Sequence, residues 1–277
     1  MTQYYYLISS LPELASDTLF EKHPYPTFEE FAREELNLVD YVDMRKCFLI
    51  NDASNISSKL GEIPFEMKSP SFYTENELEY GLVEPDEFFD FFSEFIWDIR
   101  LERQNQFTIS RENELLWRMM TALSTEEESV IRGFPREYLI FKARLKNLTT
   151  ALACRKDGRP YASEIIPFDH FSNKIGMSQA PDFGIGDELG VMEPLIDTFA
   201  DSSTLEIERA ITRASWKWLD EKIGYGHFSR ETVFSFAIRI ADVERWLAIT
   251  PAGGKRMLDE LLENLHRDIE SPTEYHL

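Results

Sequence analysis

The chain has 277 residues, of which 29 are basic and 50 are acidic, so its formal net charge at pH 7 is −21. A surface this negative repels phosphate backbones and anionic lipid headgroups, and we therefore expect no nucleic-acid partner. The length is enough for one large domain or two smaller ones, each with a sizeable core.

Helical periodicity dominates the chain. Apolar residues recur every three or four positions, and the apolar/polar alternation of half-buried strands is scarce, with only the opening YYYLI open to either reading. The pattern predicts an all-α fold with about nine helices. Their expected ranges are 27–37, 38–60, 85–105, 112–123, 125–133, 136–155, 203–223, 230–249 and 254–269.

Two of these helices have recognisable start signals. Thr27 and Glu30 have the spacing of a capping box, in which each side chain binds a backbone N–H at the beginning of a helix. Pro85 suits the first helical position, where the N–H that proline lacks has no intrahelical partner.

Composition divides the chain into three parts. Nine glycine and proline residues fall within 156–203, together with several aspartates and serines. Such residues favour turns and loops. We therefore expect N-terminal helical bundles at 1–155, an irregular Gly/Pro-rich crossover at 156–203 and a C-terminal helical bundle at 204–277.

Two predicted helices share a weak sequence repeat. Residues 49–60 and 141–152 share a pattern of apolar and asparagine positions, in which Asn55 corresponds to Asn147. Asparagine is unfavourable inside a helix, so its occurrence in both copies asks for an explanation. An internal duplication and a chance match are both open interpretations.

The stretch FSFAIRIADVERWLAI, residues 234–249, is apolar on almost every side. Arg239 and Asp242 lie on its one narrow polar strip, and the charges exclude a membrane span, which needs about 20 apolar residues. We therefore expect a buried bundle helix. Glu244 lies opposite the polar strip, so either it meets a partner charge or another protein docks on that face.

A second feature is a row of acidic residues in the predicted helix 85–105. Like charges at this spacing cost a helix a few tenths of a kcal/mol each. Either the row is a docking strip for a basic partner, or it is a thin solvated edge of a buried helix. The candidate partner-binding residues are Glu87, Asp90, Glu94, Asp98, Glu244 and Arg245.

No catalytic constellation is recognisable. The segment GIGDELG, residues 184–190, lacks the preceding strand and the Lys-Ser/Thr of a phosphate loop, and no histidine belongs to an HExxH motif. The two cysteines have no CxxC spacing, and no signal peptide is visible, which indicates a reducing cytoplasm. We expect neither enzymatic activity nor a cofactor or metal ion.

The sequence also allows an alternative interpretation as an enzyme. Asp86 and Asp90 resemble the aspartates with which all-helical isoprenoid enzymes hold magnesium diphosphate, although no second metal-binding motif is visible. The alternative function is therefore a magnesium-dependent all-helical enzyme that acts on a diphosphate substrate.

Several stretches resemble the C/d-type family of V-type ATPase subunits, which couples the stalk to the membrane ring. Residues 234–249 are similar to an apolar helix near the C-terminus of that family, with Trp246 where an asparagine is usual. Residues 205–221, LEIERAITRASWKWLDE, and the two asparagine-containing helices resemble further helices of the family. The opening MTQYYYLISSLPEL also resembles an uncharacterised bacterial family encoded beside V-type ATPase subunits.

The resemblance implies repeated three-helix bundles in a funnel-like arrangement. It also implies a non-catalytic subunit or accessory factor of a bacterial V-type ATPase, which couples or docks the central stalk to the membrane rotor ring. The implied partners are central-stalk subunits and the proteolipid ring. The expected location is the cytoplasm, with peripheral attachment to the inner face of the plasma membrane and no transmembrane segment.

Overall fold

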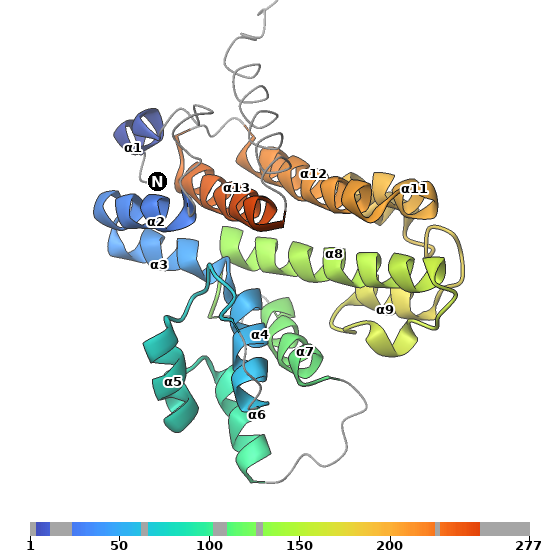
Figure 1. Cartoon of the computed structure of the whole chain (residues 1–277), viewed down its shortest axis with the longest axis horizontal. Helices are drawn as coiled ribbons and strands as arrows, with labels where there is room; N and C mark the ends of the chain where they lie inside the picture. Colours follow the sequence, from blue (N-terminus) through green and yellow to red (C-terminus); the bar gives the residue numbers. More distant parts are fainter. Residues whose placement is uncertain are drawn as a thin grey trace, which may run out of the picture. The chain divides into compact units, whose positions relative to one another are not determined.

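Figure 1 shows the computed structural model of the chain, which describes residues 4–11, 24–61, 66–101, 110–125, 130–224 and 228–249. Within these ranges there are thirteen α-helices, three 3-10 helices and no strand, so the prediction of an all-α fold is confirmed. The helix expected at 254–269 lies outside the described residues, as does part of the one expected at 125–133.

The helices have the following bounds. The α-helices are α1 (Tyr5–Ser10), α2 (Pro24–Glu35), α3 (Leu38–Lys46), α4 (Leu49–Leu60), α5 (Glu75–Val83), α6 (Asp90–Arg100), α7 (Arg111–Ser124), α8 (Phe134–Lys156), α9 (His170–Met177), α10 (Gly186–Leu189), α11 (Pro194–Asp201), α12 (Thr204–Ile223) and α13 (Arg230–Ile249). The 3-10 helices are η1 (Pro85–Glu87), η2 (Ala162–Glu164) and η3 (Gly190–Met192).

Two N-terminal helix boundaries differ from expectation. α2 begins at Pro24, so Thr27 lies inside the helix and does not begin it. Prolines are tolerated in a first turn, because the N–H groups there have no intrahelical partner. The expected single helix 38–60 is interrupted at Cys47 and Phe48, which are both buried. No glycine or proline marks this break, so packing has overridden the helical propensity.

The helix expected to begin at Pro85 begins instead at Asp90. Pro85 starts only the short η1, after which Phe88 is extended. The buried Phe88 ring fills the space beside Gly81, where an added Cβ would lie 2.5 Å from the ring. Burying a phenylalanine contributes about 1.5–3 kcal/mol, which offsets the loss of one or two helical hydrogen bonds at about 0.5–1.5 kcal/mol each.

The chain forms two compact units. Unit 1 combines residues 1–44 with 220–277, and unit 2 comprises residues 45–219. The composition-based division at 155 and 203 stays a prediction, as does the arrangement in repeated three-helix bundles. The range 156–203, expected to be irregular, contains α9 and α11.

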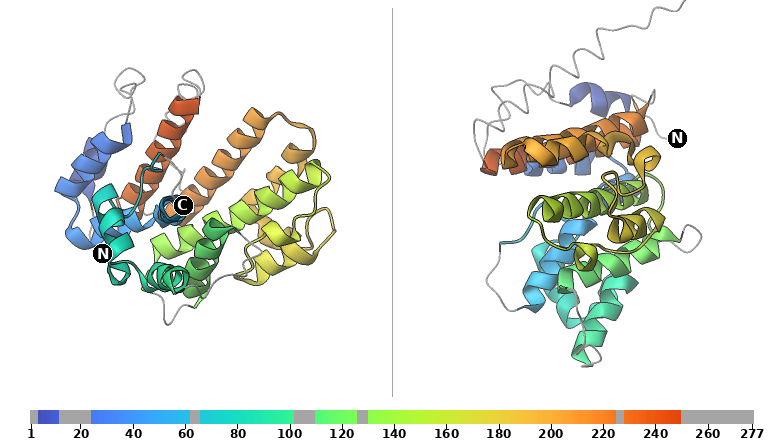
Figure 2. Two further views of the ribbon diagram at one scale, coloured as in Figure 1. Left: turned by 60° about the horizontal axis from the view of Figure 1, so that its bottom comes forward. Right: turned by 90° about the vertical axis from the view of Figure 1, so that its right-hand side faces the viewer.

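In unit 1, α13 packs alongside α2 (Figure 1, Figure 2). Residues 233–240 of α13 are buried, which confirms the expectation of a buried helix. The rings of Phe28 on α2 and Phe236 on α13 lie 5.1 Å apart. The buried Arg239 guanidinium forms an ion pair with Asp220, so its charge is compensated inside the protein.

In unit 2, the hydrophobic core is built mainly from α4, α6, α7 and α8. α7 packs against α4, α6 and α8. A group of phenylalanines from α6 and from residues 88–89 just before it lies in this core, with edge-to-face contacts such as that of Phe91 with Phe92 at 4.6 Å. Such contacts are worth about 0.5–1.5 kcal/mol beyond the burial of apolar area.

Arg155 of α8 binds the segment 178–183, which follows that helix in the chain. Its guanidinium donates to the carbonyl oxygens of Ser178 and Pro181, each at 3.0 Å. The same group lies 3.5 Å from the centre of the Phe183 ring. These contacts hold residues 178–183 against α8 within unit 2. None of the described helices combines the length and apolar character that crossing a bilayer requires.

Candidate functional site

The predicted acidic strip is divided between two elements. Glu87 belongs to η1, whereas Asp90 is the first residue of α6 and Glu94 follows one turn later. All three side chains are exposed, and none forms an ion pair or a hydrogen bond with another described residue. Their role in binding a partner stays a prediction.

The fourth member of the strip, Asp98, is used inside the protein. It is half-buried and accepts a hydrogen bond from Arg118 of α7 at 2.9 Å. Arg118 also donates to Glu114 at 2.9 Å, so one guanidinium serves two carboxylates. Asp98 therefore stabilises the contact of α6 with α7.

The two aspartates of the magnesium hypothesis lie on different elements. Asp86 is in η1, and its Oδ1 accepts the indole N–H of Trp97 at 2.9 Å and the hydroxyl of Ser93 at 3.3 Å. Asp90 begins α6. The described residues contain no group of three or more His, Cys, Asp or Glu side chains that could hold a metal ion. One of the two carboxylates is thus already engaged in orienting a tryptophan.

Glu244 binds the N-terminal turn of α2 within unit 1. Its Oε2 accepts the backbone N–H of Tyr25 at 2.8 Å, in the first turn of α2. A carboxylate at this place is favourable, because the N–H groups of a helix N-terminus carry a partial positive charge. Arg245 is exposed, with its guanidinium 5.7 Å from the centre of the Trp246 ring.

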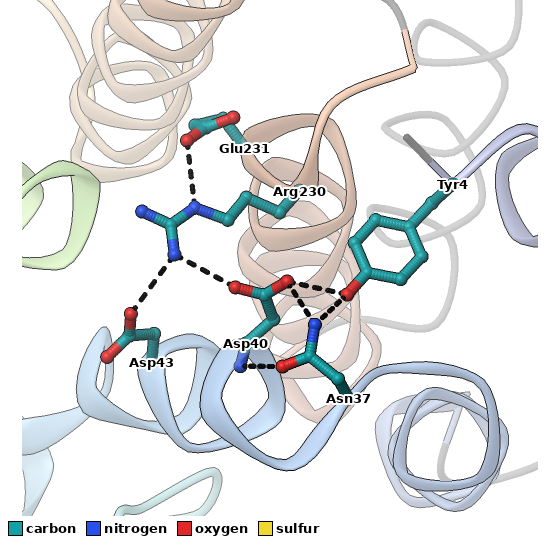
Figure 3. A network of polar contacts seen from close by, with 6 residues as sticks. All are labelled: Tyr4, Asn37, Asp40, Asp43, Arg230 and Glu231. Carbon is teal, nitrogen blue, oxygen red and sulfur yellow. Dashed lines mark hydrogen bonds and ion pairs between the residues drawn. The ribbon is translucent and has the colours of Figure 1, made fainter. Parts of the chain in front are cut away.

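Unit 1 also contains a polar network that the sequence did not reveal (Figure 3). At its centre, Asp40 of α3 accepts the hydroxyl of Tyr4 at 2.5 Å and the amide of Asn37 at 2.7 Å. Its other oxygen accepts from Arg230, the first residue of α13, at 2.8 Å. Arg230 also contacts Glu231 at 3.1 Å and Asp43 at 3.4 Å.

The pKa values in this network indicate a structural role. Burial and the hydrogen bond to Asp40 raise the pKa of Tyr4 to about 12. Burial also acts to raise the pKa of Asp40, but the donors Tyr4 and Arg230 outweigh it, so that pKa lies below its ordinary value. At neutral pH the phenol keeps its proton and the carboxylate its charge. A general acid or base works best with a pKa near the operating pH, so neither group suits that role.

Asp52 is the second buried carboxylate that the sequence did not reveal. It is fully buried in α4, and its oxygens accept the backbone N–H groups of Phe72 at 2.8 Å and Tyr73 at 3.0 Å. Burial raises the pKa of Asp52 to about 7. A shifted pKa can mark a functional site. Here both oxygens bind the protein's own backbone and no atom reaches solvent, so a substrate has no access to them.

The sequence contains a local signal for the burial of Asp52 but none for the pairing of Asp40 with Arg230. Asp52 lies three positions before Asn55 in an apolar helical pattern, and two polar residues on one inward face indicate buried hydrogen bonds. Asp40 and Arg230 are 190 positions apart, and no local pattern connects them.

Residues 1–269 match the family model described as "Protein of unknown function (DUF2764)". The chain belongs to the DUF2764 family. The searches of curated proteins and of solved structures found no match.

The DUF2764 match overturns the resemblances drawn from the sequence, because the C/d-type family of V-type ATPase subunits does not match the chain. The quoted helical patterns have a simpler cause. α13 is apolar on several sides because it is buried, and Glu244 is conspicuous because it binds the N-terminus of α2. Many helical folds need a buried helix and a capping carboxylate, so these features did not identify a family.

Proposed function

We propose that this DUF2764 protein is a non-catalytic, all-α protein that binds another polypeptide through its surface. The observation that carries the proposal is the contrast between its inner and outer carboxylates. Asp40, Asp52 and Asp98 each accept hydrogen bonds from groups of the same chain. Asp90 and Glu94 are exposed and form no bond with another described residue.

A catalytic reading has less support from the described residues. Acid–base chemistry needs a titratable group that reaches a substrate. Three buried groups with shifted pKa values already bind other groups of the chain. Tyr4 and Asp40 hold α3 to α13 through Arg230, and Asp52 binds the connection between α4 and α5. The charge that remains available to another molecule lies on the surface.

The specific form of the proposal is a subunit or accessory factor of a bacterial V-type ATPase, docking the central stalk to the membrane rotor ring. The DUF2764 match removes the resemblance to the C/d-type family as support for this choice. The helical fold and the acidic surface support the coarser proposal of a binding protein, and the choice of the ATPase depends on the following test.

The test is co-purification of the tagged full-length chain from gently extracted membranes of its own cells. We expect central-stalk subunits to accompany it in fixed ratio, and to be lost at high salt, which screens surface charges. A chain that never accompanies ATPase subunits rejects the ATPase form of the proposal. A chain that binds no polypeptide in either the membrane or the soluble fraction rejects the binding role altogether.

A further inference from the structure

The exposed face of α6 combines acidic and apolar side chains. Asp90, Glu94, Trp97 and Leu101 follow one another at spacings of three or four residues, so they lie along one face of the helix. The last two are large apolar side chains, with exposed fractions of 39% for Trp97 and 52% for Leu101. Exposed tryptophan of this kind is enriched at protein interfaces.

Trp97 is held in a fixed orientation. Its indole N–H donates to Asp86 of η1 at 2.9 Å. The Arg100 guanidinium lies 5.2 Å from the centre of the indole, close enough for a cation–π contact. An aromatic side chain that is ordered before binding loses little entropy when a partner covers it, which favours affinity.

The same arginine brings the end of α5 to this face. Arg100 donates to the carbonyl oxygens of Leu82 and Val83, the latter at 3.1 Å. Val83 is 64% exposed. We define the Trp97 surface as the side chains of Val83, Asp90, Glu94, Trp97 and Leu101.

The charge around the Trp97 surface is mainly negative. Residues 74–101 contain nine acidic residues and a single basic one, Arg100, which is committed to backbone carbonyls. Among the acidic residues, Glu84, Glu87, Asp90 and Glu94 are exposed and form no ion pair with a described residue. An apolar centre with an acidic edge is complementary to a segment that is apolar on one side and basic beside it.

We infer that the Trp97 surface is a docking site for a basic amphipathic helix of another protein. Apolar side chains of that helix cover Trp97, Val83 and Leu101, and its lysines or arginines face Asp90 and Glu94. A second copy of this chain is a poor occupant, because two chains of net charge −21 repel each other. This inference rests on the proposed binding role and names the surface and the chemistry of the partner.

The probe that tests it is a synthetic, labelled peptide of about 18 residues, with leucines along one helical face and lysines beside them. A peptide of the same composition in scrambled order is the control for charge alone. We measure the affinity of the full-length chain for both by fluorescence anisotropy. The amphipathic peptide should bind at least about tenfold more tightly, and its affinity should fall as salt rises.

Two variants of the chain locate the binding. Trp97→Ala and the double change Asp90→Asn with Glu94→Gln should each weaken peptide binding by roughly tenfold. Matched controls lie on other exposed faces of unit 2: Met177→Ala removes an apolar side chain that is 83% exposed, and Asp187→Asn with Glu193→Gln removes two carboxylates. The controls should leave the affinity unchanged.

The inference is overturned if the scrambled peptide binds equally well, or if the controls weaken binding as much as the two variants do. It is also overturned if light scattering shows a dimer that Trp97→Ala dissociates, because a second copy then covers the surface. If Trp97→Ala does not fold, the exposed Asp90/Glu94 double variant decides alone. Co-purification that persists in both variants rejects this surface and leaves the proposed binding role standing.

Discussion

Asn147 on α8 binds both backbone polar groups of Ile166. Its amide donates to the carbonyl oxygen at 2.8 Å, and its Oδ1 accepts the N–H at 2.9 Å. Asn55 on α4 does the same to Lys68, at 3.0 Å and 2.8 Å. The two asparagines of the sequence repeat thus have the same structural role. Each lies on a helix with the repeated pattern and binds the backbone of a non-helical segment to it. This correspondence favours duplication over chance.

Replacement of Asn147 by alanine should lower the free energy of unfolding by about 2–4 kcal/mol. The change leaves a buried N–H and a buried C=O of Ile166 without partners. Urea denaturation measures the effect. Asn173→Ala, on an exposed face of α9, is the control and should change stability by less than about 0.5 kcal/mol. Equal effects of the two changes would contradict the structural role of Asn147.

The raised pKa of Asp52 should make stability depend on pH. A carboxyl whose pKa rises to about 7 on folding binds a proton more tightly in the folded chain than in the unfolded one. Its contribution is therefore fully present below the ordinary pKa of about 4 and is lost as pH rises through 7. Wild type should lose on the order of a few kcal/mol across this range through Asp52.

Asp52→Asn isolates this contribution from the other acidic residues. The variant should be less stable than wild type below about pH 5, because its NH2 group faces a backbone N–H that the carboxyl accepted. The difference in unfolding free energy between the two proteins should shrink as pH rises to about 8. A difference that stays constant over this range would show that Asp52 does not titrate there.

The network around Asp40 should respond unequally to removal of its members. Tyr4→Phe removes one hydrogen bond to the carboxylate and should cost about 1–2 kcal/mol. Arg230→Met removes the cation beside a buried carboxylate and should cost about 2–4 kcal/mol. Thermal and urea unfolding measure both. Arg33→Met, which removes an exposed arginine of α2 in the same unit, should be nearly neutral.

The pH response of this network has the opposite sign to that of Asp52. The pKa of Asp40 is lowered on folding, so its contribution is present above the ordinary pKa of the carboxyl and is lost as pH falls below it. Arg230→Met should therefore matter least in acid. A variant whose stability deficit grows on acidification would contradict the assigned partners.

Two helical glycines should respond to alanine with opposite signs. At Gly81 of α5, a Cβ would lie 2.5 Å from the Phe88 ring, so Gly81→Ala should destabilise by about 1–3 kcal/mol. At Gly176 of α9, the nearest side-chain atom is 3.9 Å away, and alanine should stabilise by about 0.5–1 kcal/mol. Urea denaturation of the pair tests whether the Phe88 ring packs closely against Gly81.

Magnesium with inorganic diphosphate should not change the melting temperature of the full-length chain. The Asp86 carboxylate accepts hydrogen bonds from Trp97 and Ser93. Asp86 and Asp90 also lie on different helices, η1 and α6, and not on one helix as the magnesium hypothesis requires. Differential scanning fluorimetry with and without both additives measures this. A rise in melting temperature that Asp86→Ala with Asp90→Ala abolishes would support the enzyme alternative over a binding role.

The long helices were predictable from sequence because all local signals agreed. α8, α12 and α13 begin and end within two residues of their expected limits, since their apolar periodicity is strong and no glycine or proline interrupts it. The break at Phe48 and the short helices α5 and α9 were not expected. The break depends on how side chains pack, which periodicity alone does not encode. α5 and α9 have local start signals that were overlooked, because Thr74 and Glu77 form a capping box and the side chain of Asp169 accepts the N–H of Ser172.

The candidate surface was only half predictable. The sequence singled out Asp90 and Glu94, which are exposed, but it placed them on a helix that begins at Pro85. The Phe88 ring beside Gly81 moves that start to Asp90. Glu87 consequently belongs to η1, and Asp98 pairs with Arg118. Asp86 and Arg100 fix the orientation of the Trp97 side chain, and no sequence pattern indicated these contacts.

Unit 1 is assembled from opposite ends of the sequence, and this affects how the protein is made. The N–H of Tyr25 cannot bind Glu244 until the ribosome has added that residue, 219 positions later. Unit 2 is contiguous, so all of its residues have been synthesised before α13 exists. A nascent chain therefore carries α2 without its packing partner throughout most of translation. Closing such a long loop makes unit 1 the slower unit to form, and the one exposed to chaperones or to misassociation on the way.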